Sequence, residues 1–375
     1  MGPKVIVRIP YLYLLFILIA TCIFCTQAIG CTAAFLKHRN HHFLAANMDW
    51  PSGDGMIVVN KRGNIKSALT NPESGFTPAR WKSRFGSVTL NQYAVDWPWA
   101  GMNESGLVGA GLMMRWAEFP EPAQQPSVFI LQWLQYQLDN FSSVSAVVAH
   151  VSKIHIRPVS PENGVHFLFC DRSGDAAVID IIDGKINVYQ GESLPVRAMA
   201  NDPYASSLVY LRRIKGFGGT LPISDSNLSN DRFARAADGV RKFSPRNFPE
   251  AIDTAFDVLD AVSVKSHPRI VTQWQVVFDL KKSQIYYRTK SDSTRRNIDM
   301  GKLDLSCSDS IRIREIVSEV EMHSAAAFEN YSYERNRHHV EALFRRHPLK
   351  PTEYENRVDR IARYPETFMC DPERE

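Results

Sequence analysis

The residue with the clearest chemical potential near the start of the chain is Cys31, which directly follows the small-x-small sequence Ala28-Ile29-Gly30. This pattern is typical of signal-peptidase sites, and the cut would fall just before Cys31. A cysteine at a new N-terminus carries a thiol with an ordinary pKa of ~8.5 and an α-amine with an ordinary pKa of ~8. The amine can accept the thiol proton, and the thiolate can then attack a carbonyl carbon. We therefore predict that Cys31 is a nucleophile that supplies its own general base.

The segment before Cys31 has the composition of an export signal. Lys4 and Arg8 precede an uncharged run, Tyr11 to Cys25, that is shorter than the ~20 apolar residues of a membrane-spanning helix. We predict a signal peptide over residues 1–30 and a mature protein that is periplasmic or secreted. Two alternatives stay open: a retained N-terminal anchor, and a lipid attached to Cys31, because residues 28–31 faintly resemble a lipobox.

Four cysteines remain after such a cut, namely Cys31, Cys170, Cys307 and Cys370. If Cys31 must stay a free thiol, the other three cannot all pair, and sequence alone assigns no disulfide. Cys170 ends an apolar run, which favours a buried core thiol.

A β-hairpin is the natural interpretation of residues 31–49, in which two apolar runs flank the polar stretch His38 to His42. Asn40 is the residue there that most readily adopts a left-handed turn conformation. If the strands pair symmetrically about Asn40, Cys31 lies opposite Asp49, with Cβ atoms ~5 Å apart. We therefore expect a carboxylate beside the new N-terminus.

The rest of the chain alternates β-rich runs with helical patterns, which predicts a layered α+β fold. We expect one domain over residues 31–320 and a charged C-terminal extension over 321–375. The expected strands are 55–59, 87–90, 106–114, 165–170, 176–181, 185–189, 273–279 and 284–288, and the expected helices are 128–139, 144–154, 206–214, 231–242 and 249–262.

Composition and motifs exclude several functions. The chain has 44% hydrophobic and 22% charged residues, which is ordinary globular material. A net charge of +4, spread along the chain, argues against a nucleic-acid partner. No P-loop, dinucleotide fingerprint or zinc spacing is present, so we expect no cofactor and no metal. His338-His339 is interpreted as a solvated helix face, and no segment after the leader approaches a membrane span.

Several separated motifs resemble the choloylglycine hydrolase and penicillin V acylase family of N-terminal-nucleophile hydrolases, and they occur in the family's order. They are CTAAF from Cys31, NMDW from Asn47, GMNESGL from Gly101, ANDP from Ala200 and DRFAR from Asp231. The stretches QWLQYQLDNF, from Gln132, and TQWQVVFD, near Trp274, are similar to Gram-negative members. The resemblance extends from Cys31 to about residue 290.

This resemblance implies a four-layer αββα fold and hydrolysis of a linear amide in an N-acyl conjugate. By its motif position, Cys31 matches the nucleophile and Asp49 the carboxylate that binds the N-terminal amine. Asn201 matches the oxyanion-holding asparagine, where one lost donor costs ~3 kcal/mol. Arg232 matches the arginine that orients the nucleophile. Conjugated bile acids, penicillin V, acyl-homoserine lactones and fatty-acid amides are all candidate substrates, and a homodimer or homotetramer is left open.

Two positions depart from the family pattern. The family usually has arginine where this chain has Ala46, and the loss of that guanidinium removes a partner that favours a thiolate. Arg39, Arg80 or Arg115 could replace it from elsewhere in the chain. A second oxyanion position falls on Met113, whose side chain cannot donate a hydrogen bond, although its backbone amide can.

Substrate contacts are assigned to Met113, Trp116 and Trp133, against the alternative that these side chains are simply core. Two other functions stay open. One is an acid-ceramidase-like lipid amidase, which cuts itself inside the chain. The other is a secreted or lipid-anchored binding protein that has lost turnover, for which Ala46 is the main argument.

Overall fold

Two stacked β-sheets form the centre of the protein in the computed structural model, which describes residues 30–70, 75–121, 124–158, 164–316, 327–346 and 350–371. The predicted signal peptide, apart from Gly30, lies outside the described residues. The first sheet has six strands in the order β14 (Ala198–Met199), β1 (Thr32–His38), β2 (His41–Trp50), β15 (Val271–Asp279), β16 (Gln284–Thr289) and β17 (Arg296–Asp299). We call it the nucleophile sheet, because β1 begins directly after Cys31, the predicted nucleophile.

The second sheet, called the wide sheet below, has nine strands. Their order is β13 (Lys185–Gln190), β12 (Ala176–Ile182), β11 (Val165–Cys170), β8 (Val108–Met113), β7 (Pro98–Asn103), β6 (Ser87–Asn91), β3 (Met56–Asn60), β18 (Arg312–Glu315) and β19 (Glu329–Asn330). Neighbouring strands in both sheets are antiparallel.

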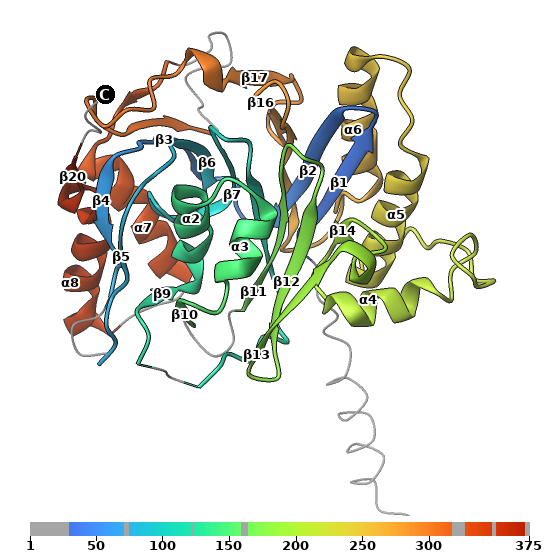
Figure 1. The fold of residues 1–375 in the computed structure, drawn as a ribbon, viewed down its shortest axis with the longest axis horizontal. Coiled ribbons are helices and arrows are strands. Elements are labelled where there is room, and N and C mark those ends of the chain that lie inside the picture. The colour runs from blue at the N-terminus through green and yellow to red at the C-terminus, as the bar shows by residue number, and fades with distance from the viewer. Residues whose placement is uncertain are drawn as a thin grey trace, which may run out of the picture.

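Helices cover the outer face of each sheet (Figure 1). On the nucleophile sheet they are α4 (Tyr204–Leu211), α5 (Ser229–Lys242) and α6 (Phe248–Ala261). On the wide sheet they are α2 (Ile130–Asn140) and α3 (Val144–His150). The predicted α+β class and four-layer αββα arrangement are therefore confirmed.

Alternation along the strands explains the layers, because successive side chains of a strand point to opposite faces. In β1 and β2, Phe35, Leu44 and Ala46 enter the core between the sheets. The intervening Leu36, Phe43 and Ala45 pack under α6 against Ile252 and Phe256. Each strand of this hairpin is consequently buried on both faces, which ties the segment after Cys31 to two apolar clusters.

The β1–β2 hairpin forms as predicted, but its register differs by one residue from the prediction. Thr32 pairs with Asn47 and His38 with His41, so the turn consists of Arg39 and Asn40, and continuing the register places Gly30 opposite Asp49. Arg39, not Asn40, has the positive φ, of 53°. The symmetric pairing about Asn40 was wrong because a two-residue turn moves the centre by half a residue, and this shifts every pair by one.

The described part of the C-terminal extension packs on the wide-sheet side of the molecule. Helices α7 (Tyr333–Arg346) and α8 (Pro351–Ala362) bury Val340, Phe344 and Ile361 against Trp97 and Phe129. A small sheet joins β20 (Met369–Cys370), β4 (Asn64–Ser67) and β5 (Arg80–Lys82), and β9 (Ser127–Phe129) pairs with β10 (His155–Arg157). The division of the chain at residue 320 stays a prediction.

A disulfide joins Cys307 to Cys370, whereas Cys31 and Cys170 are free and buried. The bridge connects the segment after β17 to β20 and so fastens the C-terminal end to the domain. The predicted burial of Cys170 is confirmed.

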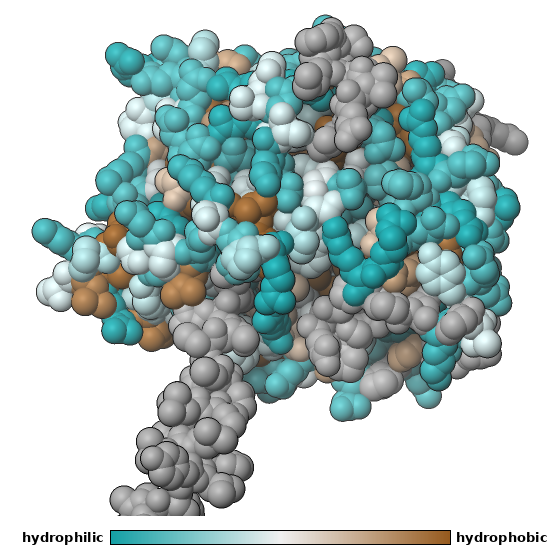
Figure 2. All heavy atoms as spheres, turned by 180° about the vertical axis from the view of Figure 1, so that it is seen from behind, coloured by the Kyte–Doolittle hydropathy of each residue, from teal (hydrophilic) through white to brown (hydrophobic). Residues whose placement is uncertain are grey.

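The face in Figure 2 is mostly hydrophilic, with small separate hydrophobic areas. Among the described residues, the large hydrophobic side chains that are exposed are Trp116, Val209, Leu221 and Met369. No helix in the described part of the chain is long and apolar enough to cross a membrane.

Candidate active site

Cys31 lies directly before β1, at one end of the nucleophile sheet, and its side chain belongs to the core between the sheets. It is 5% exposed, and its Sγ lies 4.0 Å from the backbone oxygen of Asp49. In the full-length chain the nitrogen of Cys31 is bonded to Gly30 and has no basic lone pair. The thiol is therefore in place while its predicted base is still part of a peptide bond.

Burial is the main reason that the thiol resists ionisation in this chain. Desolvation, followed by the negative charge of Asp49, raises the pKa of Cys31 to about 12. The hydrogen bond to the Asp49 backbone and the positive charge of Arg232 act in the opposite direction but are weaker. The Cys31 thiol of a chain that keeps Gly30 is thus almost entirely protonated near neutral pH.

Asp49 is completely buried near the end of β2 and has one satisfied and one unsatisfied carboxylate oxygen. Oδ1 accepts a hydrogen bond from Thr272 Oγ1 at 2.5 Å. Oδ2 has no hydrogen-bond partner among the described residues, and Arg232 Nη1 lies 3.9 Å from it. Burial raises the pKa of Asp49 to about 6, against the lowering effects of Arg232 and Thr272. An acceptor is therefore left open beside the start of β1.

Arg232 connects three parts of the site from α5. Its Nη1 donates to the Cys31 backbone oxygen at 2.7 Å and to Thr32 Oγ1 at 2.5 Å, and its Nη2 donates to Asn201 Oδ1 at 2.6 Å. The side chain is fully buried, and Nε is held by the backbone oxygen of Asn227 at 3.0 Å. A planar guanidinium can satisfy these acceptors together because its donors form a fixed fork.

Asn201 lies in the turn between β14 and α4, next to the residue that precedes Cys31. Its Nδ2 donates to the Met113 backbone oxygen at 2.8 Å, and its backbone N–H donates to Ser229 Oγ at 2.9 Å. A Cβ atom placed on Gly30 would lie 2.8 Å from Asn201 Nδ2. Gly30 therefore allows the backbone directly before Cys31 to lie close to the Asn201 amide without a clash.

Of the three predicted substrate contacts, two lie near Asn201 and one does not. The Met113 backbone is bonded to the Asn201 amide, and Trp116, 57% exposed, donates from Nε1 to Asp202 Oδ1 at 3.3 Å. Trp133 is fully buried between α2 and the wide sheet, against Phe167 and Phe169. The structure therefore places Trp133 in the outer core, because its helical position faces the sheet.

Ala46 is fully buried in the core between the sheets and is paired with Ala33 and Val276. Arg39, Arg80 and Arg115, which could have supplied a guanidinium, are all exposed. Arg39 is at the far end of β1, eight residues from Cys31. Arg232 is a guanidinium that the structure does bring to Cys31, through a hydrogen bond to the backbone oxygen of that residue.

Sequence reasoning missed two side chains that hold the site. Thr272, which binds Asp49, is the first residue of the stretch TQWQVVFD, and its place in that stretch was its one signal. His166 is fully buried, with Nδ1 at 2.9 Å from Asp180 Oδ1 and Nε2 at 2.6 Å from the backbone oxygen of Ala200. It connects the wide sheet to the turn of Asn201, and nothing in its local sequence indicates this contact.

The described residues contain no group of three or more His, Cys, Asp or Glu side chains that could hold a metal ion. The interpretation of His338-His339 as a solvated face was half wrong. His338 is exposed, but His339 is buried with Nε2 at 2.9 Å from Glu315 Oε2, because α7 packs that face on the domain.

The two stacked antiparallel sheets between helical layers define the class as an N-terminal-nucleophile hydrolase. The chain belongs to the choloylglycine hydrolase family of linear amide C-N hydrolases, whose family model matches residues 31–313. A penicillin V acylase from Pectobacterium atrosepticum is 26% identical over 261 residues, which cover 60% of this chain and 69% of the relative. The predicted family is confirmed, and the chain is an amide hydrolase.

Solved structures agree with this assignment. A penicillin V acylase from Agrobacterium tumefaciens matches with a TM-score of 0.69 and 26% identity, over 80% of this chain and 98% of that one. Two variants of a conjugated bile acid hydrolase from Clostridium perfringens match with TM-scores of 0.62 and 0.63, over 79% of this chain and all of theirs. Their identities, 17% and 19%, support the fold alone.

Proposed function

We propose that removal of residues 1–30 exposes Cys31 as an N-terminal nucleophile that hydrolyses the linear amide bond of an N-acyl conjugate. The observation that carries this proposal is the open oxygen of Asp49. Oδ2 is buried and without a hydrogen-bond partner among the described residues, and Gly30 continues the register opposite Asp49. When Gly30 leaves, the new α-amine of Cys31 becomes the natural donor to this oxygen.

The reaction follows from these positions. The Cys31 thiol passes its proton to the α-amine while Sγ bonds to the amide carbon, and the α-ammonium then protonates the leaving nitrogen as the C–N bond breaks. Water next attacks the acyl-thioester and gives its proton to the α-amine. The C–S bond then breaks, the carboxylic acid leaves, and the thiolate takes the proton from the α-ammonium.

The side-chain amide of Asn201 would stabilise the negative charge that develops on the amide oxygen. The Asn201 side-chain amide has two hydrogens, and Met113 accepts one of them. The second hydrogen would be available to the oxyanion. Arg232 holds Asn201 through its oxygen and therefore fixes the direction of the amide.

The substrate class rests on the relatives and on the surface near Asn201. The relatives that are similar to this chain at 26% identity are both penicillin V acylases. Trp116 presents an exposed ring beside Asp202, where it would contact an acyl group. We propose an N-acyl amide with an apolar acyl part, and Met113 and Trp116 as its contacts.

Export to the periplasm or outside the cell is part of the same proposal. A Cys307–Cys370 disulfide is typical of proteins that fold in an oxidising compartment.

A binding protein without turnover is the second candidate, because Ala46 replaces the family arginine.

The test begins with mass spectrometry of the exported protein, which should give an N-terminus at an unmodified Cys31. Turnover of penicillin V, conjugated bile acids, acyl-homoserine lactones and fatty-acid amides is then measured for the wild type and Cys31→Ser. Cys170→Ser, which removes a buried thiol away from the site, is the matched control. Equal rates for wild type and Cys31→Ser would reject the nucleophile, a lipid on Cys31 would reject the mechanism, and a free N-terminus without turnover would favour the binding protein.

A further inference from the structure

Thr272 occupies an irregular position at the start of β15, beside the end of β2. It is paired with Asp49, whereas the next pair joins Trp274 to Met48, so the register shifts between Thr272 and Trp274. A β-bulge of this kind re-aims a side chain and is common next to active sites. The bulge brings the Thr272 hydroxyl to the carboxylate of Asp49.

The direction of the Thr272–Asp49 hydrogen bond is fixed by a second contact. Thr272 Oγ1 accepts a hydrogen bond from the Val264 backbone N–H at 2.9 Å, and the Thr272 backbone N–H donates to Val264 O at 3.0 Å. A hydroxyl has a single hydrogen. With a lone pair engaged by Val264, that hydrogen is directed to Asp49 Oδ1.

Among the described residues, the charged and titratable groups that face Asp49 are Arg232 and Cys31. Arg232 approaches from α5, and Cys31 lies beside β1, where its α-amine would add a positive charge after cleavage. On the β15 side, Thr272 and Val264 carry no charge. Thr272 is therefore a neutral hydrogen-bond donor to Oδ1 of this carboxylate.

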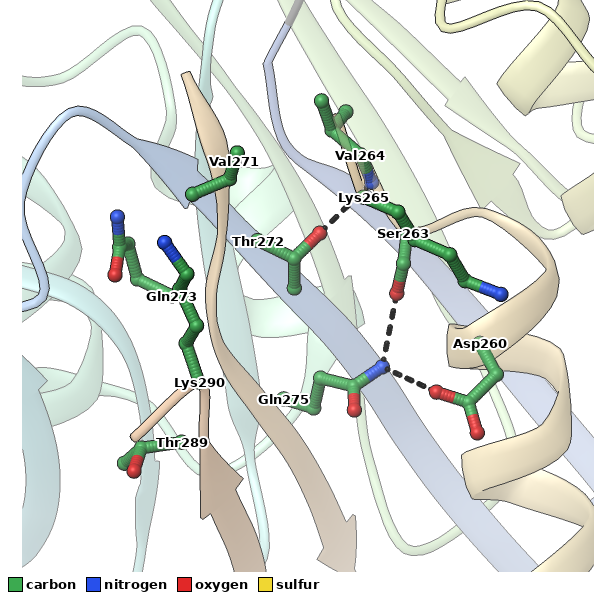
Figure 3. A pocket seen from close by; sticks show the side chains of 10 residues that line it. All are labelled: Asp260, Ser263, Val264, Lys265, Val271, Thr272, Gln273, Gln275, Thr289 and Lys290. Atoms are coloured by element: carbon green, nitrogen blue, oxygen red, sulfur yellow. Dashed lines mark hydrogen bonds between the residues drawn. The ribbon is translucent and has the colours of Figure 1, made fainter. Parts of the chain in front are cut away.

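Thr272 also separates Asp49 from a pocket of about 260 Å³ on the α6 side of the nucleophile sheet. Figure 3 shows Thr272 in its wall, with its hydroxyl bonded toward the segment of Val264. The ammonium groups of Lys265 and Lys290 point in opposite directions there, so the pocket does not gather positive charge around one ligand. Thr272 has the pocket on one side and a fully buried carboxylate on the other.

We propose that Thr272 is a positioning residue for the reaction: its hydroxyl holds the Asp49 carboxylate ionised, with the free oxygen directed to the α-amine of Cys31. This inference rests on the proposed function, because it assigns the α-amine as the partner of Asp49. Loss of the hydroxyl removes a hydrogen bond that lowers the pKa of Asp49. The Asp49 carboxylate would then become protonated at a higher pH.

The experiment compares Thr272→Val and Thr272→Ser in the exported, leader-free enzyme. We expect the acidic limb of kcat/KM to move up by about one pH unit in Thr272→Val, because a charge-assisted hydrogen bond is lost while volume is kept. Below that limb kcat should fall about tenfold with little change in KM. Thr272→Ser restores the hydroxyl and should restore the wild-type limb.

The matched control is Thr289→Val, which changes another threonine of the same pocket whose hydroxyl contacts Ser291 rather than Asp49. It should leave the acidic limb in place. A folded Thr272→Val with the wild-type limb, or a Thr272→Ser with the same shift as Thr272→Val, would overturn the proposal. If Thr272→Val does not fold, Thr272→Ala removes the same hydroxyl and is judged by the same criterion.

A measurement without turnover separates this inference from the proposed function. Infrared titration of the Asp49 carboxyl in the Cys31→Ser background, with Asp49→Asn as the spectral reference, reports its ionisation directly. An upward shift in Thr272→Val supports the role of the hydroxyl even if no amide is hydrolysed. An unchanged titration rejects that role even if the enzyme is active.

Discussion

Arg232 Nη1 donates a hydrogen bond to the backbone oxygen of Cys31 at 2.7 Å, across a sequence separation of 201 residues. The same guanidinium holds Thr32 and Asn201, so the proposed nucleophile and the proposed oxyanion donor share one rigid partner. A positive charge fixed beside the thiol favours its ionised form. Arg232 therefore provides part of what the family arginine would provide at Ala46.

Replacement of Arg232 by lysine should affect both catalysis and stability. A single ammonium cannot bond to Cys31, Thr32 and Asn201 together, and unsatisfied buried acceptors are costly. We expect kcat to fall at least about a hundredfold and the free energy of unfolding to fall by about 3 kcal/mol. Steady-state kinetics and urea unfolding measure the two effects.

Arg235→Lys is the control for this prediction. Arg235 lies on the same helix and is bonded to the backbone oxygens of Ala261 and Ser226 instead. It should lower stability without a large loss of kcat. Equal losses of kcat in both variants would mean that the effect of Arg232 is only structural.

Restoring the family arginine by Ala46→Arg should destabilise the protein without raising its activity. Ala46 is completely buried among apolar side chains, and by strand alternation Asp49 lies on the other face of β2. An arginine there would be a buried charge without a carboxylate partner, which costs about 3 kcal/mol or more.

The control for size is Ala46→Met, which adds bulk without charge and should cost about 1–3 kcal/mol. Thermal unfolding and kcat/KM of both variants give the comparison. If Ala46→Arg is as stable as Ala46→Met and more active, the site has retained room for the family arginine.

Asp49 should make the uncleaved chain less stable as the pH rises. Its folded pKa, about 6, is higher than the ordinary value of 3.8, so the folded state binds more protons between these values. The contribution of Asp49 to the free energy of unfolding is fully present below pH 3.8 and is lost as the pH rises past 6. The total loss is about 3 kcal/mol.

A chain that keeps Gly30, with an affinity tag in place of residues 1–29, allows this measurement by urea unfolding from pH 4 to 7. Asp49→Asn should flatten the dependence. In the chain that begins at Cys31, the α-ammonium lowers the pKa of Asp49, so the dependence should also weaken. An equally steep loss of stability in Asp49→Asn would assign the effect to another group.

Reduction of the Cys307–Cys370 disulfide should loosen the C-terminal end of the protein. The bridge closes a segment with a sequence separation of 63, and loss of such a bond typically costs about 2–4 kcal/mol. Thermal unfolding should shift to lower temperature in reductant. Cys307→Ser should show the lower melting temperature from the start and no further change with reductant, and a shift of the variant by reductant would contradict the assignment.

The sequence determined the local elements of this protein. Strands β11, β12 and β13 were predicted almost to the residue, because their apolar runs are separated by tight turns. The turn at Asp183-Gly184 has positive φ at both residues, 54° and 66°, as such hairpins require. Family motifs also identified Cys31, Asp49, Asn201 and Arg232, which the structure brings to one end of the nucleophile sheet.

Only the tertiary structure decided how these residues meet. The register of β1 and β2 depends on the length of the turn between them. A shift of one residue decides whether Cys31 or Gly30 lies opposite Asp49. Whether Trp133 faces a substrate or a sheet depends on which side of α2 is covered. The contacts of Thr272 with Asp49 and of His166 with Ala200 join segments that are remote in sequence, and long-range packing leaves no periodic signal in a single chain. The sequence therefore predicts the chemistry of Cys31, whereas the contacts of Arg232 with Cys31 and of Thr272 with Asp49 arise from packing α5 and β15 against the first hairpin.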